Sequence, residues 1–373
     1  METIRSTANK RRNKRRLNVR RVILAVLALF VLIGAVIAII FGIKSCTTAV
    51  KKRSLPFKNG TTYAYTGDGF LYMDGRTLRF FSLTDEKNNF SEELQYDPKG
   101  VTGTAELKAI YTGSSVQIVN TRHDNSFDGA ILKTAVGSKY LAVYVENLDG
   151  TKQLIVYNSA GDRCWSEDYT ESTLLDFGFE GGSSDVFYTS ELVIKGNGVS
   201  TAIKTRDIKR QSNTGDLYVQ GQIVKKVFVT KKSVFAYGTD SVIRFDRSTN
   251  KETYRVLCNG WECLDASCNK DRMNLLLQKT NDRDGSLSVL SLKEGSSAEE
   301  STYPITDVKD NLACFMLVGK AVSVHSDKLV IYGQKGTVEK TVAFETPVTG
   351  AAKLDDGSIV VFTADGTALY TFK

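Results

Sequence analysis

The chain contains only two histidines, His123 and His325, and it lacks the short motifs of the common hydrolases. There is no Gly-x-Ser-x-Gly nucleophile elbow, no His-Glu-x-x-His zinc motif and no phosphate-binding loop. Either histidine could act as a general base, but isolated histidines between strands are usually structural or solvated. The sequence therefore offers no local pattern for serine hydrolysis, zinc proteolysis or nucleotide hydrolysis.

Cysteine is scarce, and its spacing is uncommon. Three of the six cysteines, Cys258, Cys263 and Cys268, recur with four residues in each gap. Structural zinc sites usually take two close pairs with gaps of about two to four residues, so this spacing argues against a metal site. One disulfide within the trio and buried free thiols both stay open. With Cys164 and Cys314 the body holds five cysteines, an odd number, so at least one thiol stays unpaired unless it bonds another chain.

Proline is also rare, and no clear linker interrupts the chain beyond residue 60. Segments rich in Gly and Ser at 181–184 and 295–301 are typical of loops, and neither is followed by a change in composition. No stretch of 12 residues in the body keeps a helical period. We therefore expect residues 61–373 to form one body rather than several domains.

One long apolar run is present, over residues 22–43. Its 22 uncharged residues would reach about 33 Å as a helix, enough to cross a hydrocarbon core of about 30 Å. Nine basic residues precede it and five follow it before residue 59, which predicts a cytoplasmic N-terminus and an extracellular body. A cleaved signal peptide would have an apolar region of only about 7–15 residues and an Ala-x-Ala-like site. A lipoprotein site at Cys46 is disfavoured by Lys44, which stands where such a site needs a small or apolar residue.

The net charge of +7 is concentrated in the N-terminal segment. Residues 1–58 carry 14 basic residues and one acid, so the body carries a formal charge of −6. Nucleic-acid-binding domains need clustered positive charge, which this body lacks. The basic tail is expected to set topology and to contact anionic lipid. The predicted organisation is a basic cytoplasmic tail at 1–21, a transmembrane helix at 22–43, a tether at 44–60 and an extracytoplasmic domain at 61–373.

Short strand-like runs separated by turn residues fill the body. Several are joined by Asp-Gly, as at Asp74-Gly75 and Asp365-Gly366, which supplies the positive φ of a tight hairpin. Hairpins begin near residues 70, 107, 140, 186, 234, 275, 322 and 359. A repeat of about 40–50 residues with four strands per unit predicts an all-β fold, a β-propeller. The body length divided by about 45 residues gives about seven four-stranded blades, while the eight hairpins keep eight blades open. An array of β-sandwiches would show a longer repeat and linkers.

Two segments resemble the blade ends of quinoprotein-like propellers, which often read Asp-x-x-Thr-Gly-x-x-x-Trp after the third strand. Asp246–Tyr254 has Asn in place of Gly and Tyr in place of Trp, and Tyr157–Trp165 keeps Gly-x-x-x-Trp but lacks the Asp. With its basic tail, span and length, the chain resembles a clostridial (Firmicutes) family of single-pass membrane proteins. That family carries an extracytoplasmic quinoprotein (PQQ)-like or WD40-like β-propeller. The resemblance implies architecture and location, and it brings no chemistry to transfer.

Patterns of propeller enzymes are missing as well. Quinoprotein dehydrogenases need an adjacent Cys-Cys pair and sialidase-type propellers need intact Ser-x-Asp-x-Gly-x-x-Trp boxes, and the chain has neither. Adjacent acids such as Asp355-Asp356 lie in turns and point apart, whereas glycoside hydrolysis needs two carboxylates about 5–10 Å apart. Distant blades could still bring residues together, and the strongest candidates are Arg122, His123 and Asp124, with Trp261 as a stacking platform.

The sequence favours a single-pass cell-envelope protein whose propeller is a non-enzymatic binding or assembly scaffold. We expect an envelope protein, a peptide or a wall polymer as partner, and no catalytic residue, cofactor, metal or nucleic acid. Two alternatives stay open: a cell-wall or glycan-directed hydrolase or lyase with residues in the central channel, and an envelope sensor that needs a cytoplasmic partner. We expect the ring to close by placing Thr61–Thr66 and Ala368–Phe372 in one blade.

Overall fold

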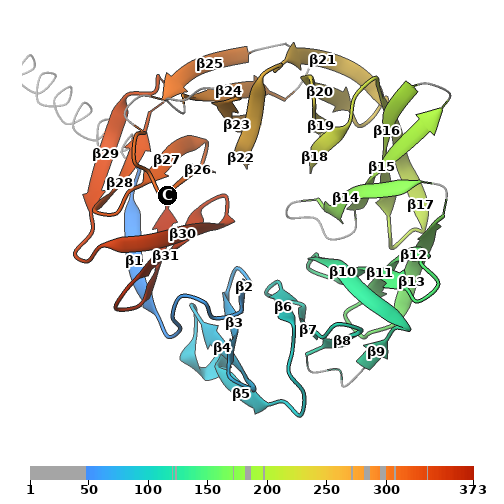
Figure 1. Cartoon of the computed structure of the whole chain (residues 1–373), viewed down its shortest axis with the longest axis horizontal. Helices are drawn as coiled ribbons and strands as arrows, with labels where there is room; N and C mark the ends of the chain where they lie inside the picture. The colour runs from blue at the N-terminus through green and yellow to red at the C-terminus, as the bar shows by residue number, and fades with distance from the viewer. Residues whose placement is uncertain are drawn as a thin grey trace, which may run out of the picture. The chain divides into compact units, whose positions relative to one another are not determined.

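Each repeat of the chain forms a four-stranded antiparallel sheet in which consecutive strands pair. The computed structural model describes residues 48–373 except 120, 122–123, 171, 181–185, 196–197, 270–271, 281–285, 295–299, 306–307 and 334. Residues 49–373 belong to one compact unit. Within it, eight sheets stand as blades around a central opening (Figure 1).

The blades are numbered in chain order, and the first four follow one another without crossovers. Blade 1 contains β2 (Tyr63–Tyr65), β3 (Gly69–Asp74), β4 (Thr77–Ser82) and β5 (Phe90–Glu93), with a short 3-10 helix, η1 (Glu86–Asn88), before β5. Blade 2 contains β6 (Gly100–Gly103), β7 (Lys108–Tyr111), β8 (Ser115–Ile118) and β9 (Asp124–Ser126). Blade 3 contains β10 (Gly129–Val136), β11 (Tyr140–Asn147), β12 (Lys152–Asn158) and β13 (Arg163–Tyr169). Blade 4 contains β14 (Thr173–Phe179), β15 (Val186–Lys195), β16 (Gly198–Asp207) and β17 (Ser212–Gln220).

The remaining blades complete the ring. Blade 5 contains β18 (Val224–Val229), β19 (Ser233–Gly238), β20 (Ser241–Asp246) and β21 (Lys251–Leu257). Blade 6 contains β22 (Trp261–Asn269), β23 (Arg272–Lys279), β24 (Leu287–Lys293) and β25 (Glu300–Ile305). Blade 7 contains β26 (Ala313–Leu317), β27 (Lys320–Val324), β28 (Lys328–Tyr332) and β29 (Val338–Ala343). Blade 8 contains β30 (Val348–Asp355), β31 (Ser358–Thr363), β32 (Thr367–Phe372) and β1 (Val50–Leu55).

The predicted propeller is confirmed, with eight blades. The eight predicted hairpin starts each fall at the beginning of the second strand of a blade, from β3 to β31. The division that favoured seven blades was wrong because it assumed a repeat of about 45 residues. Blade 2 and blade 7 have strands of at most six residues, which shortens the average repeat.

The ring closes through strands from both ends of the described chain. β1 pairs along its length with β32, from Val50 opposite Phe372 to Leu55 opposite Thr367. The N–H groups of Ala49 and Lys373 each donate to the carbonyl of the other, both at 3.0 Å. This pairing leaves no gap in blade 8, as a closed propeller requires.

Two details of the sequence interpretation need correction. The segment 44–60 was expected to be a tether, but β1 lies inside it and is part of blade 8. The strand Thr61–Thr66 was expected to close the ring, but β2 pairs with β3 and is the first strand of blade 1. β1 was not predicted from the sequence, because it is an outer strand in which Lys51, Lys52 and Arg53 are exposed. Apolar and polar residues therefore do not alternate along it.

The hydrophobic core is divided among the interfaces between blades. Eight buried clusters are present among the described residues, and each draws side chains from two neighbouring blades, including blades 8 and 1. The second and third strands of the blades supply most of these side chains. Every residue of β19 is buried, because both faces of that strand are covered. Outer strands alternate instead, as in β17, where Leu217 and Val219 are buried and Tyr218 is exposed.

The turns that resemble quinoprotein-like blade ends lie where the resemblance implies, between the third and fourth strands of blades 3 and 5. Asp246 accepts hydrogen bonds from the N–H groups of Ser248 and Thr249, at 2.9 and 3.0 Å. Asn250 adopts a φ of 55° in the glycine position of the pattern, and Gly161 adopts 91° in the other turn. In blade 5, the hydrogen bonds of Asp246 stabilise a turn that has Asn250 where the pattern has glycine.

The predicted transmembrane span at 22–43 and the cytoplasmic tail at 1–21 lie outside the described residues. In the described part of the chain, no helix is long and apolar enough to cross a membrane.

Candidate functional site

The candidate residues chosen from the sequence do not meet in one place. Asp124 begins β9 in blade 2, whereas Trp261 begins β22 in blade 6. Arg122 and His123 lie outside the described residues. Trp261 packs against the core cluster between blades 5 and 6, and its carbonyl accepts a hydrogen bond of 3.0 Å from Tyr237 Oη. The tryptophan is therefore a packing residue rather than a stacking platform beside Asp124.

The second histidine is structural. His325 is buried, and its Nε2 lies 3.0 Å from the hydroxyl of Ser323, which lies 3.1 Å from Tyr332 Oη. A hydroxyl beside an imidazole is the arrangement of a nucleophile and its base. Here, however, the Ser323 side chain is fully shielded from solvent, so no substrate can reach it. The three groups satisfy one another inside blade 7.

All five body cysteines are free thiols in the structure. Cys258 and Cys263 are buried in the cluster between blades 5 and 6, and burial raises the pKa of each thiol to about 11. At neutral pH both are therefore protonated and unreactive. No group of three or more His, Cys, Asp or Glu side chains within the described residues is arranged to hold a metal ion.

A largely buried cluster of ion pairs joins blades 3 and 4. It was not predicted from the sequence. Lys204 Nζ lies 2.8 Å from Glu191, whose side chain is 4% exposed, and 3.3 Å from Glu167. Arg206 binds the second oxygen of Glu167 at 2.9 Å and stacks over Trp165 at 4.8 Å from the ring centroid. Two carboxylates are thus balanced by two cations, which is the composition of a structural tie between blades.

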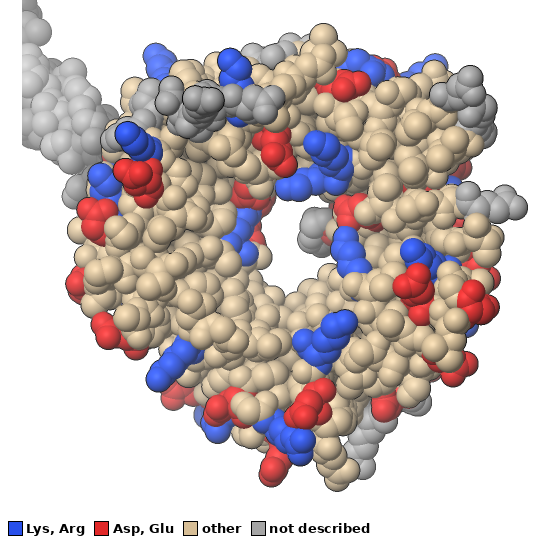
Figure 2. All heavy atoms as spheres, viewed as in Figure 1, with Lys and Arg blue, Asp and Glu red and all other residues tan. Residues whose placement is uncertain are grey.

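Charged side chains lie around part of the central opening (Figure 2). The first strand of each blade is its innermost strand (Figure 1). On four consecutive blades a β-bulge shifts the register of that strand, and a charged residue follows directly after it. These residues are Lys133, Asp176, Lys226 and Asp265. Lys133 forms an ion pair with Asp176 of the next blade at 2.5 Å, and Lys353 of blade 8 forms one with Asp265 at 3.0 Å. Asp176 and Asp265 are therefore each held by a lysine of a neighbouring blade.

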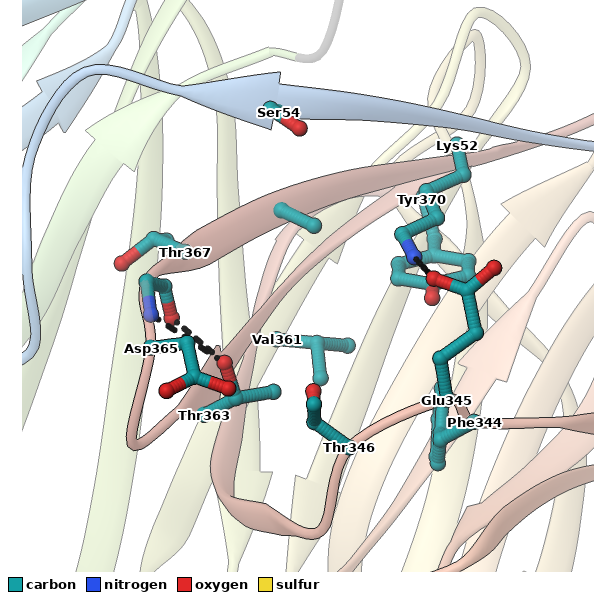
Figure 3. A pocket seen from close by; sticks show the side chains of 12 residues that line it. Lys52, Ser54, Phe344, Glu345, Thr346, Val361, Thr363, Asp365, Thr367 and Tyr370 are labelled. Atoms are coloured by element: carbon teal, nitrogen blue, oxygen red, sulfur yellow. Dashed lines mark hydrogen bonds and ion pairs between the residues drawn. The ribbon is translucent and has the colours of Figure 1, made fainter.

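A small cleft lies between the loop after β29 and the outer part of blade 8 (Figure 3). Lys52 and Glu345 form an ion pair of 2.9 Å across one end, and that hydrogen bond lowers the pKa of Glu345. At the other end, Thr363 Oγ1 accepts a hydrogen bond of 3.2 Å from the N–H of Gly366. Its volume of about 180 Å³ is below the range of about 300–1,000 Å³ typical of ligand pockets.

A larger groove lies on the outer wall between blades 2 and 3. It exists because the two blades differ in size: β9 has three residues, whereas β12 and β13 have seven each. Beside the short outer strand of blade 2, a hollow remains along the outer part of blade 3. The groove has a volume of about 720 Å³ and continues into a second hollow of about 640 Å³ that shares four of its residues. This volume lies within the range of ligand pockets.

The floor of the groove comes from β12, and one wall comes from β9 and the residues after it. Gln153, Ile155 and Tyr157 alternate along β12 and so face the same side. Phe127 stands edge-on to Tyr157 with ring centroids 6.5 Å apart. From Gln153 to Tyr157 the strand spans about 13 Å, the length of four extended residues. Arg163 lies at the end of the groove.

Two aspartate side chains of the groove have no partner among the described residues. Asp124 and Asp128 are exposed, and among the described residues neither side chain has a hydrogen-bond or ion-pair partner. Among the described residues that line the groove, Asp149 adds a third carboxylate and Arg163 is the one cation. This described lining therefore carries an excess of negative charge.

An exposed leucine stands at one end of the groove on a braced turn. Leu148 is 90% exposed at the tip of the β11–β12 hairpin. The N–H of Gly150 donates to the carbonyl of Asn147 at 2.9 Å, and Gly150 has the positive φ of 82° that such a turn needs. Asp149 Oδ1 accepts from the backbone N–H of Thr151 at 2.9 Å and from its hydroxyl at 2.6 Å. The leucine is thus presented to solvent on a fixed support.

No protein-family model matches the sequence, and no curated protein matches it. Solved β-propellers are similar in structure. BamB from Moraxella catarrhalis has 12% identity and a TM-score of 0.52, covering 86% of this chain and 98% of that chain. The WD40 domain of SCAP from fission yeast has 8% identity and a TM-score of 0.58, covering 87% and 98%. Sqt1 from Saccharomyces cerevisiae has 7% identity and a TM-score of 0.54, covering 87% and 99%.

The chain folds as a WD40-like and BamB-like β-propeller. At these identities the similarity shows the fold alone. The groove between blades 2 and 3 was not identified from the sequence, although Asp124 was chosen. The available signal was the run of short strands between residues 100 and 126, which predicts an outer strand too short to cover its neighbour.

Proposed function

We propose that this protein is a single-pass cell-envelope protein whose propeller is a non-enzymatic binding scaffold, and that a partner docks in the groove between blades 2 and 3. The predicted span at 22–43 and the charge asymmetry around it support the membrane anchor and the extracytoplasmic location. The fold supports the binding role by analogy, because propellers present loops and inter-blade grooves on a rigid ring. The neighbours named above supply that analogy and no ligand.

The observation that carries the proposal is the groove on the outer wall between blades 2 and 3. A seven-residue strand pair lies beside a three-residue outer strand, and the groove holds two carboxylates without a partner among the described residues, beside an exposed leucine. Solvent-exposed apolar side chains are common singly. Here the leucine stands on a braced turn at the end of a groove, where a segment bound in the groove would contact it.

The hydrolase or lyase alternative would need free carboxylates that converge in the channel. Asp176 and Asp265 are instead bound by Lys133 and Lys353, and Asp176 also accepts a hydrogen bond of 3.1 Å from Tyr188. Both carboxylates already bind a lysine of a neighbouring blade, so neither is free to face a scissile bond. We therefore retain the scaffold as the proposed function.

Photo-crosslinking in intact cells tests the proposal. A photoreactive amino acid replaces Leu148, and the matched control carries it at Leu257, which is 73% exposed in blade 5. We expect a discrete crosslinked species from position 148 that is absent from position 257. Equal crosslinking at both positions, or none at position 148, would contradict docking in the groove.

A further inference from the structure

The groove between blades 2 and 3 has a definite charge pattern, which restricts its occupant. Its lining contains three aspartates and one arginine. Glu146 at the adjoining hollow is balanced by Lys152 at 3.6 Å. The net negative charge of the described lining therefore comes from the aspartates. Asp124 and Asp128, which have no side-chain partner in the described part of the chain, lie on the same wall.

The shape of the groove is that of a linear segment. The floor follows β12, and the walls are β9 on one side and the β11–β12 turn at one end. A length of about 13 Å accommodates four to five extended residues. Leu148, 90% exposed, offers an apolar contact at one end, and Phe127 is half-buried in the wall.

We infer that the occupant is an extended, lysine- or arginine-containing peptide segment of a partner protein, with an apolar side chain that packs on Leu148. This inference rests on the proposed function and names its partner class. The basic side chains neutralise Asp124 and Asp128, which otherwise have no partner among the described residues. An anionic or neutral wall glycan would leave both carboxylates unpaired, so the charge pattern favours the peptide.

The charge dependence can be measured with defined peptides on the full-length protein in detergent. The probes are two fluorescent heptapeptides, Ser-Lys-Leu-Lys-Val-Lys-Ser and its counterpart with Glu at each Lys position. The test variant is Asp124→Asn with Asp128→Asn. The control variant is Asp216→Asn with Asp327→Asn, which removes two exposed charges from blades 4 and 7.

We expect the lysine peptide to bind at least tenfold more tightly than the glutamate peptide. The test variant should weaken that binding about fivefold to tenfold, as expected for two exposed ion pairs, and the control variant should change it less than twofold. Binding should also weaken as salt increases, because ions screen exposed charges over about 8–10 Å. Equal binding of both peptides, or equal effects of the two variants, would overturn the inference.

The same variants separate this inference from the proposed function in cells. If the crosslink from position 148 persists unchanged in the Asp124→Asn, Asp128→Asn variant, a partner docks but its recognition is not cationic, and the inference fails alone. If the crosslinked species is a wall glycan, the inference fails and docking in the groove stands. If no crosslink forms at position 148, the proposed function itself fails.

Discussion

Lys353 of blade 8 reaches past the innermost strand of blade 7 and binds Asp265 of blade 6, with Nζ 3.0 Å from Oδ2. The same carboxylate oxygen accepts a hydrogen bond of 2.8 Å from the N–H of Met316 on β26. Lys353 also donates to the carbonyl of Ala266 at 2.6 Å. One lysine and one aspartate therefore connect three consecutive blades at the central channel.

Replacement of Lys353 by Met should destabilise the ring, because it leaves Asp265 mostly buried without its cation. Both side chains retain some exposure, 17% and 20%, so we expect a loss of about 2 kcal/mol, below the roughly 3–5 kcal/mol of a fully buried pair. The measurement is the urea midpoint of the full-length protein in detergent. Lys152→Met is the control, since its pair with Glu146 is exposed at 40% and 43%, and it should cost less than about 1 kcal/mol. Equal midpoint shifts would contradict a tie between blades.

Replacement of Lys204 by Met should have a larger effect. Burial lowers the pKa of Lys204, but the hydrogen bonds and charges of Glu191 and Glu167 outweigh this and raise it. Without the lysine, Glu191 is a buried carboxylate that has lost its cation, and we expect a loss of about 3–5 kcal/mol at neutral pH. The measurement is again the urea midpoint of the full-length protein in detergent.

The double variant Lys204→Met with Glu191→Gln is the matched control for that loss. It removes the buried carboxylate together with its cation, so it should recover part of the stability that the single variant loses. A double variant as unstable as the single variant would show that the loss does not come from an uncompensated carboxylate.

The thiols of Cys258 and Cys263 should resist alkylation in the folded protein. Burial raises the pKa of both to about 11, so the reactive thiolate is a minor species at neutral pH. Iodoacetamide at pH ~8 should modify neither residue in the native protein, as followed by peptide mass spectrometry. In denaturant without reductant, all five body cysteines should take up the label, since all are free. Two residues that are labelled only after reduction would reveal a disulfide.

Deletion of residues 367–373 should unfold the whole propeller rather than one end. The deletion removes β32, which pairs with both β31 and β1, and so opens the ring. Two sheet edges are then exposed, which favours aggregation. Removal of Lys373 alone is the control, since it leaves the pairing of β32 intact. A truncated protein that melts at the temperature of the parent would show that closure is dispensable.

The predicted topology is open to a direct measurement. The charge asymmetry around residues 22–43 predicts a cytoplasmic N-terminus and an extracellular propeller. Protease added to intact, wall-stripped cells should digest the chain beyond about residue 50 and spare an epitope placed before residue 21. A propeller that is digested only after lysis would refute this orientation.

The architecture could be predicted from the sequence because it depends on local patterns. Each blade holds a buried second strand followed by a tight turn, so a run such as Tyr140–Asn147 and its Asp149-Gly150 turn mark a blade by themselves. Eight such hairpins indicated the blade number better than the mean repeat length did. β1 could not be found in this way, since its exposed Lys51–Arg53 run gains its order from pairing with the distant β32.

The candidate groove could not be predicted from a local motif, because it results from a difference between two blades. Its shape comes from a difference between β9 and β13, which belong to different blades, and its charge comes from loops that meet only in the ring. Asp124 was chosen from the sequence because it follows Arg122 and His123. In the structure it is of interest because it lines the same groove as Asp128 and Leu148. The buried cluster of Lys204 and Glu191 was missed for the same reason, because opposite charges 13 residues apart show no pairing until the strands are in register.

Closure by β1 and β32 also affects how the protein is made. β1 emerges from the ribosome among the first residues of the propeller, and its only strand partner is among the last. At about 5–20 residues per second, synthesis of the intervening chain of roughly 300 residues takes about 15–60 s. Throughout that time β1 has no strand to pair with, and the blades already folded form an open arc. A nascent chain released early would keep this unpaired edge permanently, so quality control that recognises exposed strand edges would distinguish complete from incomplete copies.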